Sequence, residues 1–170
     1  MRVRELCNIV SCNPATGELR WLPREACDRY DKMFNTKYAG KLAGTSVNVD
    51  GYNVLHIKNE WLLVHRVVWA MAHGRWPRKD LDHINGDRTD NRLANLREAT
   101  RLQNQANYRT PTTNKSGYKG VSWCTRSKRW RAYISINSVT RHLGMFTDKR
   151  DAIAARRAAA IKYHKGFYRE

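Results

Sequence analysis

Four side chains between residues 82 and 104 have the types and the spacing needed to hydrolyse a phosphodiester bond. Asp82 and His83 are adjacent, Asn95 follows twelve residues after His83, and Asn104 lies nine residues further on. The carboxylate of Asp82 and the amide oxygen of Asn104 are hard ligands of the kind that Mg²⁺ prefers. A histidine titrates close to neutrality, which suits a general base acting on water. The set therefore predicts one hydrolytic centre that holds a single divalent ion.

Short elements must position these side chains. Residues 81–84 alternate in polarity and are expected to form a strand, which an Asn-Gly-Asp turn follows. Residues 91–98 should return as a strand or as irregular structure. Thr100 can cap a polar helix that extends to about residue 108. Upstream, residues 61–73 are largely apolar and precede a glycine, which predicts a buried helix.

The first 60 residues mix short apolar stretches with turn signals and are expected to be rich in β-structure. Residues 18–22 and 52–57 are predicted strands, and Asp50-Gly51 before the second one is typical of a hairpin turn. A short helix is predicted around residues 23–33. The sequence leaves open whether this region contacts a target or braces the centre.

The chain resembles phage HNH endonucleases, including homing enzymes of group I introns, in the runs HRVVWAMAHGRWP and LDHINGDRTDNRLANLREATRLQNQAN. The resemblance implies a ββα-metal fold in which His83 is the general base and Asn95 braces the loop and orients that histidine. It also implies that Asp82 and Asn104 hold the metal ion. The second helix histidine of colicin-like members is absent, since Tyr108 lies one turn after Asn104. This departure favours Mg²⁺ or Mn²⁺, one ion per active site.

The remaining histidines are not expected to take part in catalysis. His65 lies near the start of the predicted helix and is expected to pack against its neighbours. His56, His73 and His164 have no surrounding set of reactive residues in the sequence. They are interpreted as surface or packed histidines.

Positive charge is concentrated at the C-terminal end of the chain. The whole chain carries 32 basic and 15 acidic residues and a net charge of +17. Residues 111–170 contribute 14 basic and 3 acidic side chains, so they carry +11 of this charge. Such a surface attracts polyanions and binds phosphates by releasing their counterions. The C-terminal third is therefore the predicted electrostatic anchor for nucleic acid.

After a polar linker at residues 110–116 the pattern changes to short strands and a helix. Residues 118–123, 129–137 and 139–146 are predicted strands, and Thr147 is expected to cap an Ala-rich helix from residue 148 to about His164. This module resembles the AP2 DNA-binding domain in the runs SGYKGVSW, KRWRAYISI, RHLGMF and DAIAARRAAAIKYHKG. The resemblance implies a three-stranded antiparallel sheet on one helix, with the exposed sheet face in the major groove.

The DNA-binding candidates come from both halves of the chain. Those carried over from the AP2 resemblance, or placed in its first turn to hold phosphates, are Lys119, Ser122, Arg126, Arg129, Arg131, Tyr133, Ser135, Thr140 and His142. Those in the HNH segment are Arg92, Arg97 and Arg101. Tyr133 and Ser135 differ from the acidic and arginine residues usual in plant AP2 domains, so the plant target sequence is not carried over.

The predicted fold class is α+β, a modular protein with a ββα-metal nuclease core and an AP2-like sheet and helix. The expected domains are a β-rich region at 1–60, the HNH core at 61–109, the linker at 110–116 and the AP2-like domain at 117–168. No apolar run approaches the roughly 18 residues that span a bilayer, and no secretory signal is evident. We therefore expect a cytoplasmic protein, in the host cell cytoplasm if it is phage-encoded.

The primary hypothesis is a homing or free-standing HNH endonuclease that acts on double-stranded DNA, without a membrane or a small-molecule cofactor. An alternative is a non-catalytic, sequence-specific DNA-binding regulator whose HNH segment only supports the fold. A protein that binds or cuts RNA is a further alternative, although the narrow major groove of A-form RNA does not suit a groove-reading sheet. The sequence gives neither the oligomeric state nor the choice between nicking and double-strand cleavage.

Overall fold

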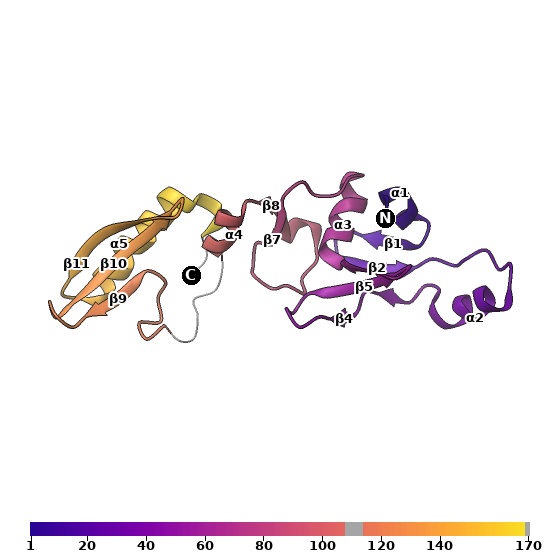
Figure 1. Ribbon diagram of the computed structural model, residues 1–170, viewed down its shortest axis with the longest axis horizontal. Helices are drawn as coiled ribbons and strands as arrows, with labels where there is room; N and C mark the ends of the chain where they lie inside the picture. Colours follow the sequence, from indigo (N-terminus) through magenta and orange to yellow (C-terminus); the bar gives the residue numbers. More distant parts are fainter. Residues whose placement is uncertain (108–113, 169–170) are drawn as a thin grey trace. The chain divides into compact units, whose positions relative to one another are not determined.

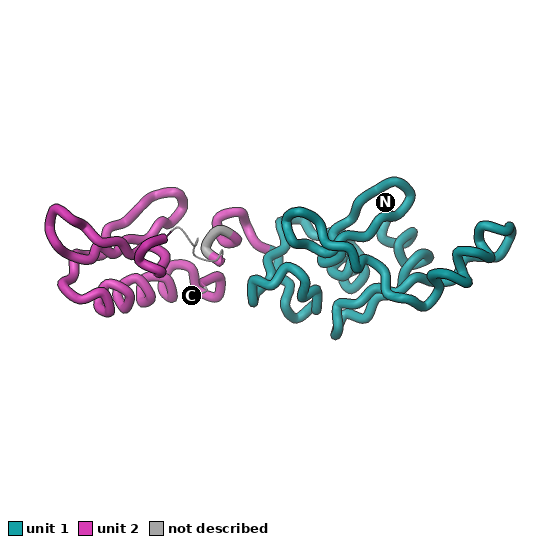
Figure 2. Tube along the Cα trace, turned by 90° about the horizontal axis from the view of Figure 1, so that it is seen from below, with its two compact units in different colours: residues 1–98 teal, residues 99–170 magenta. Residues whose placement is uncertain are grey.

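The structure of the protein is a computed structural model that describes residues 1–107 and 114–168. The chain divides into two compact units, residues 1–98 and residues 99–170, which Figure 2 shows in different colours. The predicted linker lies outside the described residues as far as residue 113. Among the helices of the described residues, none is long and apolar enough to cross a membrane.

The first unit is built from small sheets around one apolar helix, α3 (Figure 1). Its strands form sheets in the orders β1-β2-β3, β4-β5-β6 and β7-β8. In chain order its elements are α1 (Val3–Cys7), β1 (Val10–Asn13), β2 (Glu18–Trp21), α2 (Arg29–Tyr38), β3 (Leu42–Ala43), β4 (Ser46–Val47), β5 (Asn53–Ile57), β6 (Glu60–Leu63), α3 (Val64–His73), β7 (Asp80–His83), η1 (Leu93–Asn95) and β8 (Leu96–Ala99).

One hydrophobic core joins the N-terminal region to α3. Val64, Val67 and Val68 of α3 are buried in the same cluster as Leu6 of α1 and Leu55 of β5. Burial of such side chains contributes about 1.5–3 kcal/mol each. Residues 1–60 therefore share the core of the helix that follows them.

The helix predicted over residues 61–73 starts later than expected, because residues 60–63 form strand β6. Lys58 and Asn59 both adopt positive φ angles, 47° and 65°, and make a two-residue hairpin turn between β5 and β6. Helix α3 begins only at Val64, and it ends at Gly74 with φ 67°, as predicted. The apolar residues before Val64 thus belong to the sheet.

Other predictions for the first unit hold in part. The predicted strands are present as β2 and β5, and the Asp50-Gly51 turn joins β4 to β5. The helix predicted around residues 23–33 is displaced, because Asp28 is its N-cap and accepts a hydrogen bond from the backbone N–H of Asp31 at 2.8 Å. Helix α2 therefore starts at Arg29. The sequence patterns did not predict α1 or β1.

The second unit contains the predicted sheet and helix of the C-terminal module. Its described elements are α4 (Arg101–Asn107), β9 (Val121–Cys124), β10 (Arg129–Ile136), β11 (Val139–Phe146), α5 (Lys149–His164) and η2 (Lys165–Phe167). The strands pair antiparallel in the order β11-β10-β9, and α5 packs on β10 and β11. Val121, Ala132 and Ala152 form the centre of its core.

Side chains form the N-terminal caps of both α-helices in this unit. The Thr100 hydroxyl accepts from the Gln103 N–H at 3.3 Å, and the Gln103 side chain accepts from the Thr100 N–H at 2.8 Å. Thr100 therefore caps α4, as predicted. Helix α5 is capped by Asp148, which accepts from the Arg150 N–H at 2.8 Å, and not by Thr147 as expected.

Candidate active site

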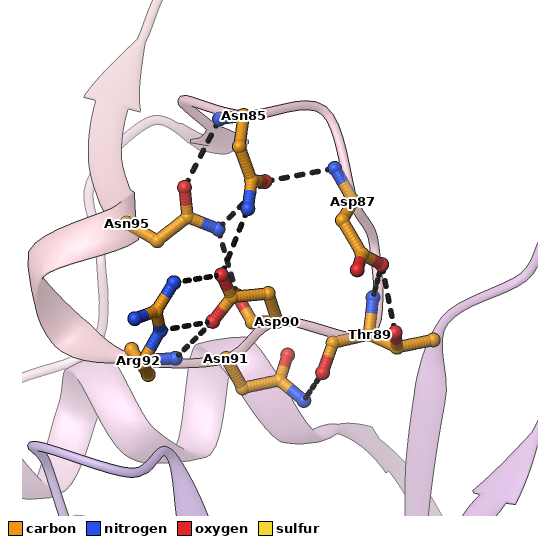
Figure 3. Close-up of polar contacts among 7 residues, drawn as sticks. All are labelled: Asn85, Asp87, Thr89, Asp90, Asn91, Arg92 and Asn95. Atoms are coloured by element: carbon orange, nitrogen blue, oxygen red, sulfur yellow. Dashed lines mark hydrogen bonds and ion pairs between the residues drawn. The ribbon is translucent and has the colours of Figure 1, made fainter.

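Asn95 holds the shape of the loop that joins β7 to β8 (Figure 3). Its Oδ1 accepts from the Asn85 backbone N–H at 3.0 Å, and its Nδ2 donates to the Asn85 Oδ1 at 3.0 Å and to the Asp90 carbonyl at 2.9 Å. Asn95 is buried, so these bonds form away from water. The loop that begins directly after His83 is therefore fixed from inside. The contribution of Asn95 to catalysis stays a prediction.

Polar side chains within the loop add to this arrangement (Figure 3). Asp90 accepts from the Asn85 Nδ2 at 2.8 Å and from the Arg92 Nε and Nη2 at 2.8 and 2.6 Å. The Arg92 guanidinium holds the pKa of Asp90 at about 2. Asp87 accepts from the Thr89 N–H and hydroxyl at 2.9 and 2.7 Å. Arg92, a predicted DNA contact, is thus paired within the loop while its side chain stays 57% exposed.

Two turns from the first 60 residues support the same loop. Gly17 has φ +74°, and a Cβ there would lie 2.3 Å from the Asn91 carbonyl carbon, so only glycine fits this approach. The Leu93 N–H donates to the Pro14 carbonyl of the same turn at 2.9 Å. From the other side, Arg88 donates to the Asp50 carbonyl. The N-terminal region therefore braces the loop, one of the two roles that the sequence leaves open.

His83 is the last residue of β7 and is buried, with 5% of its surface exposed. Burial lowers its pKa below the ordinary value for histidine. The groups that oppose this shift are the Asn91 side chain and the carboxylates of Asp82, Asp87 and Asp90. The imidazole is therefore neutral at neutral pH, the state that can accept a proton.

His65 lies against His83, a neighbour that the sequence did not reveal. The two imidazole rings are 4.9 Å apart in an edge-to-face arrangement, and the Tyr52 ring lies 5.2 Å from His65 and 5.9 Å from His83. His65 is 4% exposed. Burial, then repulsion from His83 and Arg66, lowers its pKa to about 3. Its polar character within an apolar helical run was the available signal.

Asp82, the predicted metal ligand, is paired with an arginine from the neighbouring strand. It is 3% exposed, and its Oδ2 accepts from the Arg97 Nε at 2.8 Å and lies 2.7 Å from Nη2. The Arg97 side chain is only 20% exposed. Arg97 was predicted to contact DNA, but this placement directs its guanidinium to Asp82, because a buried carboxylate needs a nearby charge partner.

The structure places the predicted metal ligands in different units. Asp82 belongs to the first unit, whereas Asn104 lies on α4 in the second, where its N–H donates to the Thr100 carbonyl at 2.9 Å. No group of three or more His, Cys, Asp or Glu side chains among the described residues is arranged to hold a metal ion. A single buried carboxylate beside an imidazole still suits a hard ion such as Mg²⁺, which keeps several waters.

The predicted groove-reading residues share one face of the second unit's sheet. Strand pairing sets Arg131 opposite Ser122 on β9, Tyr133 opposite His142 and Ser135 opposite Thr140 on β11. The buried residues Ala132 and Ile134 alternate with them, so this set faces away from the core. Arg126 and Arg129 are exposed in and beside the β9–β10 turn, and Arg101 is exposed at the start of α4.

Lys119 does not belong to that face. It is partly buried and lines a pocket with Arg156 and His164 of α5. Lys119 precedes β9 and lies near Arg156 of α5, so strand pairing does not place it with the sheet residues, and its contact with DNA stays a prediction.

Comparisons with known proteins give a phage relative and a solved structure to which the chain is similar. Protein 3.8 of Escherichia phage T7 is 39% identical over 72 residues, which are 42% of this chain and 60% of that protein. The chain thus spans three fifths of the length of this relative. A solved structure, described as "DNA binding and cleavage by the HNH homing endonuclease I-HmuI", is 17% identical, with a TM-score of 0.43 over 96% of this chain and 90% of the other.

The family comparison falls on the segment that carries the candidate site. Residues 62–106 match the family described as HNH endonuclease. The match includes α3, both strands of the β7-β8 sheet and most of α4. The AP2 resemblance of residues 117–168 stays a prediction. The match agrees with the HNH resemblance of this segment, and residues 62–106 of this chain are similar to the HNH endonuclease family.

Proposed function

We propose that the protein is a metal-dependent DNA endonuclease that hydrolyses phosphodiester bonds. The observation that carries this proposal is the burial of His83 against His65, next to Asp82 at the end of β7, inside the segment that matches HNH endonucleases. A neutral imidazole beside a carboxylate is suited to activate water. The loop held by Asn95 fixes the backbone directly after this histidine.

In the proposed reaction His83 accepts a proton from the water that attacks the scissile phosphate. A divalent ion at Asp82 would stabilise the charge on the phosphate and on the leaving 3′ oxygen, and Asn104 as its second protein ligand stays a prediction from the sequence. Arg97 donates a hydrogen bond to Asp82 and directs its carboxylate, so we assign Arg97 to positioning that carboxylate instead of DNA contact. Asn95 keeps the His83 loop in place.

We further propose that the exposed sheet face of the second unit docks double-stranded DNA. The side chains of Arg131, Tyr133 and His142 would reach base edges, and Arg126 and Arg129 would hold phosphates. The high positive charge of residues 111–170 supports this assignment. The docking face and the hydrolytic centre belong to different units, so each can be inactivated by itself.

A non-catalytic DNA-binding protein is the competing hypothesis, because Arg97 already neutralises the predicted metal ligand Asp82. The two are separated by forming the complex with plasmid DNA in EDTA and then adding Mg²⁺. The nuclease hypothesis predicts that supercoiled plasmid converts to nicked or linear DNA only after Mg²⁺ is added. Stable binding with no conversion, in Mg²⁺ and in Mn²⁺, would leave only the regulator hypothesis.

A further inference from the structure

A pocket of about 670 Å³ lies within the second unit, and Tyr133 and Ser135 of the exposed sheet face are among its lining residues. It is lined by α4, the end of β10 and its turn, the C-terminal end of α5, and η2. Its basic lining residues are Lys119, Arg156, His164 and Lys165, and none of the lining residues that the structure describes is Asp or Glu. The described part of the pocket therefore gathers positive charge without a carboxylate.

Arg156 is the central group of this pocket. It is 6% exposed, and its Nε and Nη1 are buried and have no hydrogen-bond partner among the described atoms. Buried arginines are otherwise found paired, because an isolated buried charge is strongly destabilising. The guanidinium lies against Gly120, where a Cβ would be 2.6 Å from Nε. The glycine thus keeps space for the head group.

The groups around Arg156 increase the positive potential instead of neutralising it. Burial and repulsion from Arg156 lower the pKa of Lys119, and burial together with both cations lowers the pKa of His164. Asp148 and Asp151, the acidic residues of this module that the structure describes, lie at the N-terminal end of α5, at least one helical turn from Arg156. The carbonyls that end α5 give only partial negative charge.

We propose that this pocket binds a phosphate group, with Arg156 as its main ligand, Lys119 as a supporting cation and the His164 imidazole as a supporting hydrogen-bond donor. The planar guanidinium presents adjacent N–H groups that match two phosphate oxygens. The phosphate can be inorganic, part of a nucleotide, or a DNA backbone phosphate, since the recognition chemistry is shared. The proposal does not depend on cleavage by the HNH segment.

The test measures the melting temperature of the full chain as phosphate replaces chloride at constant ionic strength. The variants are Arg156→Met and, as the control with an equal change of charge on an exposed position of the same helix, Arg157→Met. Wild type and Arg157→Met should be stabilised in a saturable manner, while Arg156→Met should lose at least about tenfold in phosphate affinity. Equal saturable stabilisation of both variants would overturn the proposal.

A second measurement does not depend on how well a variant folds. In the wild-type protein, the side-chain Nε–H resonance of Arg156 should shift on titration with inorganic phosphate or with a short DNA duplex. A shift with duplex at concentrations where phosphate has no effect would assign the pocket to DNA backbone, and the reverse order to a soluble phosphate. No shift with either probe would contradict the proposal.

Discussion

His83 and Asn95 lie close together in the fold, but their replacement should have different consequences. His83 provides a reactive imidazole, whereas Asn95 provides three hydrogen bonds to the loop. Asn95→Ala removes all three hydrogen bonds of this buried side chain, which costs about 2 kcal/mol. Urea unfolding should show this loss. Asn95→Asp keeps the acceptor for the Asn85 N–H but sets a buried carboxylate oxygen against the Asn85 Oδ1 and the Asp90 carbonyl, so it should lose at least as much. A loss below about 0.5 kcal/mol in Asn95→Ala would argue against the bracing role.

The burial of His65 predicts how the stability of the protein depends on pH. The pKa of His65 falls from 6.5 to about 3 on folding, so the unfolded chain binds a proton at a higher pH than the folded protein does. The free energy of unfolding is therefore full above pH 6.5 and decreases as the pH falls toward 3. Between pH 6.5 and 4.5 this amounts to about 2 kcal/mol, from 1.36 kcal/mol per pH unit. His65→Phe should remove that part of the acid destabilisation and keep the aromatic packing.

The control for this measurement is His56→Phe, at an exposed histidine of the same unit. Its unfolding free energy should follow the wild-type pH profile. If His65→Phe lost stability with falling pH as steeply as the control, burial of neutral His65 would not be the cause.

At the scale of elements, the turn between β1 and β2 supports the active-site loop. Gly17→Ala would push a Cβ to 2.3 Å from the Asn91 backbone, whereas Gly40→Ala, at a similar φ of +76°, would meet nothing within 4 Å. Both lose about 1 kcal/mol to the left-handed backbone. Gly17→Ala should lose at least about 2 kcal/mol more and should also slow DNA cleavage. Equal stability of the two variants would contradict the close approach of the two backbones.

Local sequence patterns correctly predicted helix ends that depend on residues close together in the chain. Thr100 with Gln103 marked the start of α4, and Gly74 marked the end of α3. The sequence patterns did not separate β6 from α3, because the apolar residues 61–63 fit a strand as well as a helix. The turn at Lys58-Asn59 is what places them in a strand.

Contacts between distant residues were not predictable in this way. His65 meets His83, and Arg97 meets Asp82, only through the packing of α3 and β8 on β7. The amino-acid types of the site could therefore be predicted, but the partners that set its pKa values could not.

At the scale of the whole molecule, the uneven charge makes a prediction for DNA binding. Arg126→Gln with Arg129→Gln should lower affinity and reduce the slope of log K against log salt by about 0.9 for each DNA phosphate that the variant no longer neutralises. Lys32→Gln with Lys37→Gln, an equal change of charge on exposed positions of α2, is the control. Equal slopes for the two double variants would contradict docking by the second unit.

The most direct test of the central claim is the single-turnover rate of plasmid cleavage in Mg²⁺ by His83→Ala, with wild type and the exposed-site variant His56→Ala as references. Loss of the general base should lower the rate by about 10²–10⁴-fold while DNA affinity in EDTA stays unchanged. His56→Ala should cut at the wild-type rate. Cleavage by His83→Ala at the rate of His56→Ala would contradict the assignment of the active site to the end of β7.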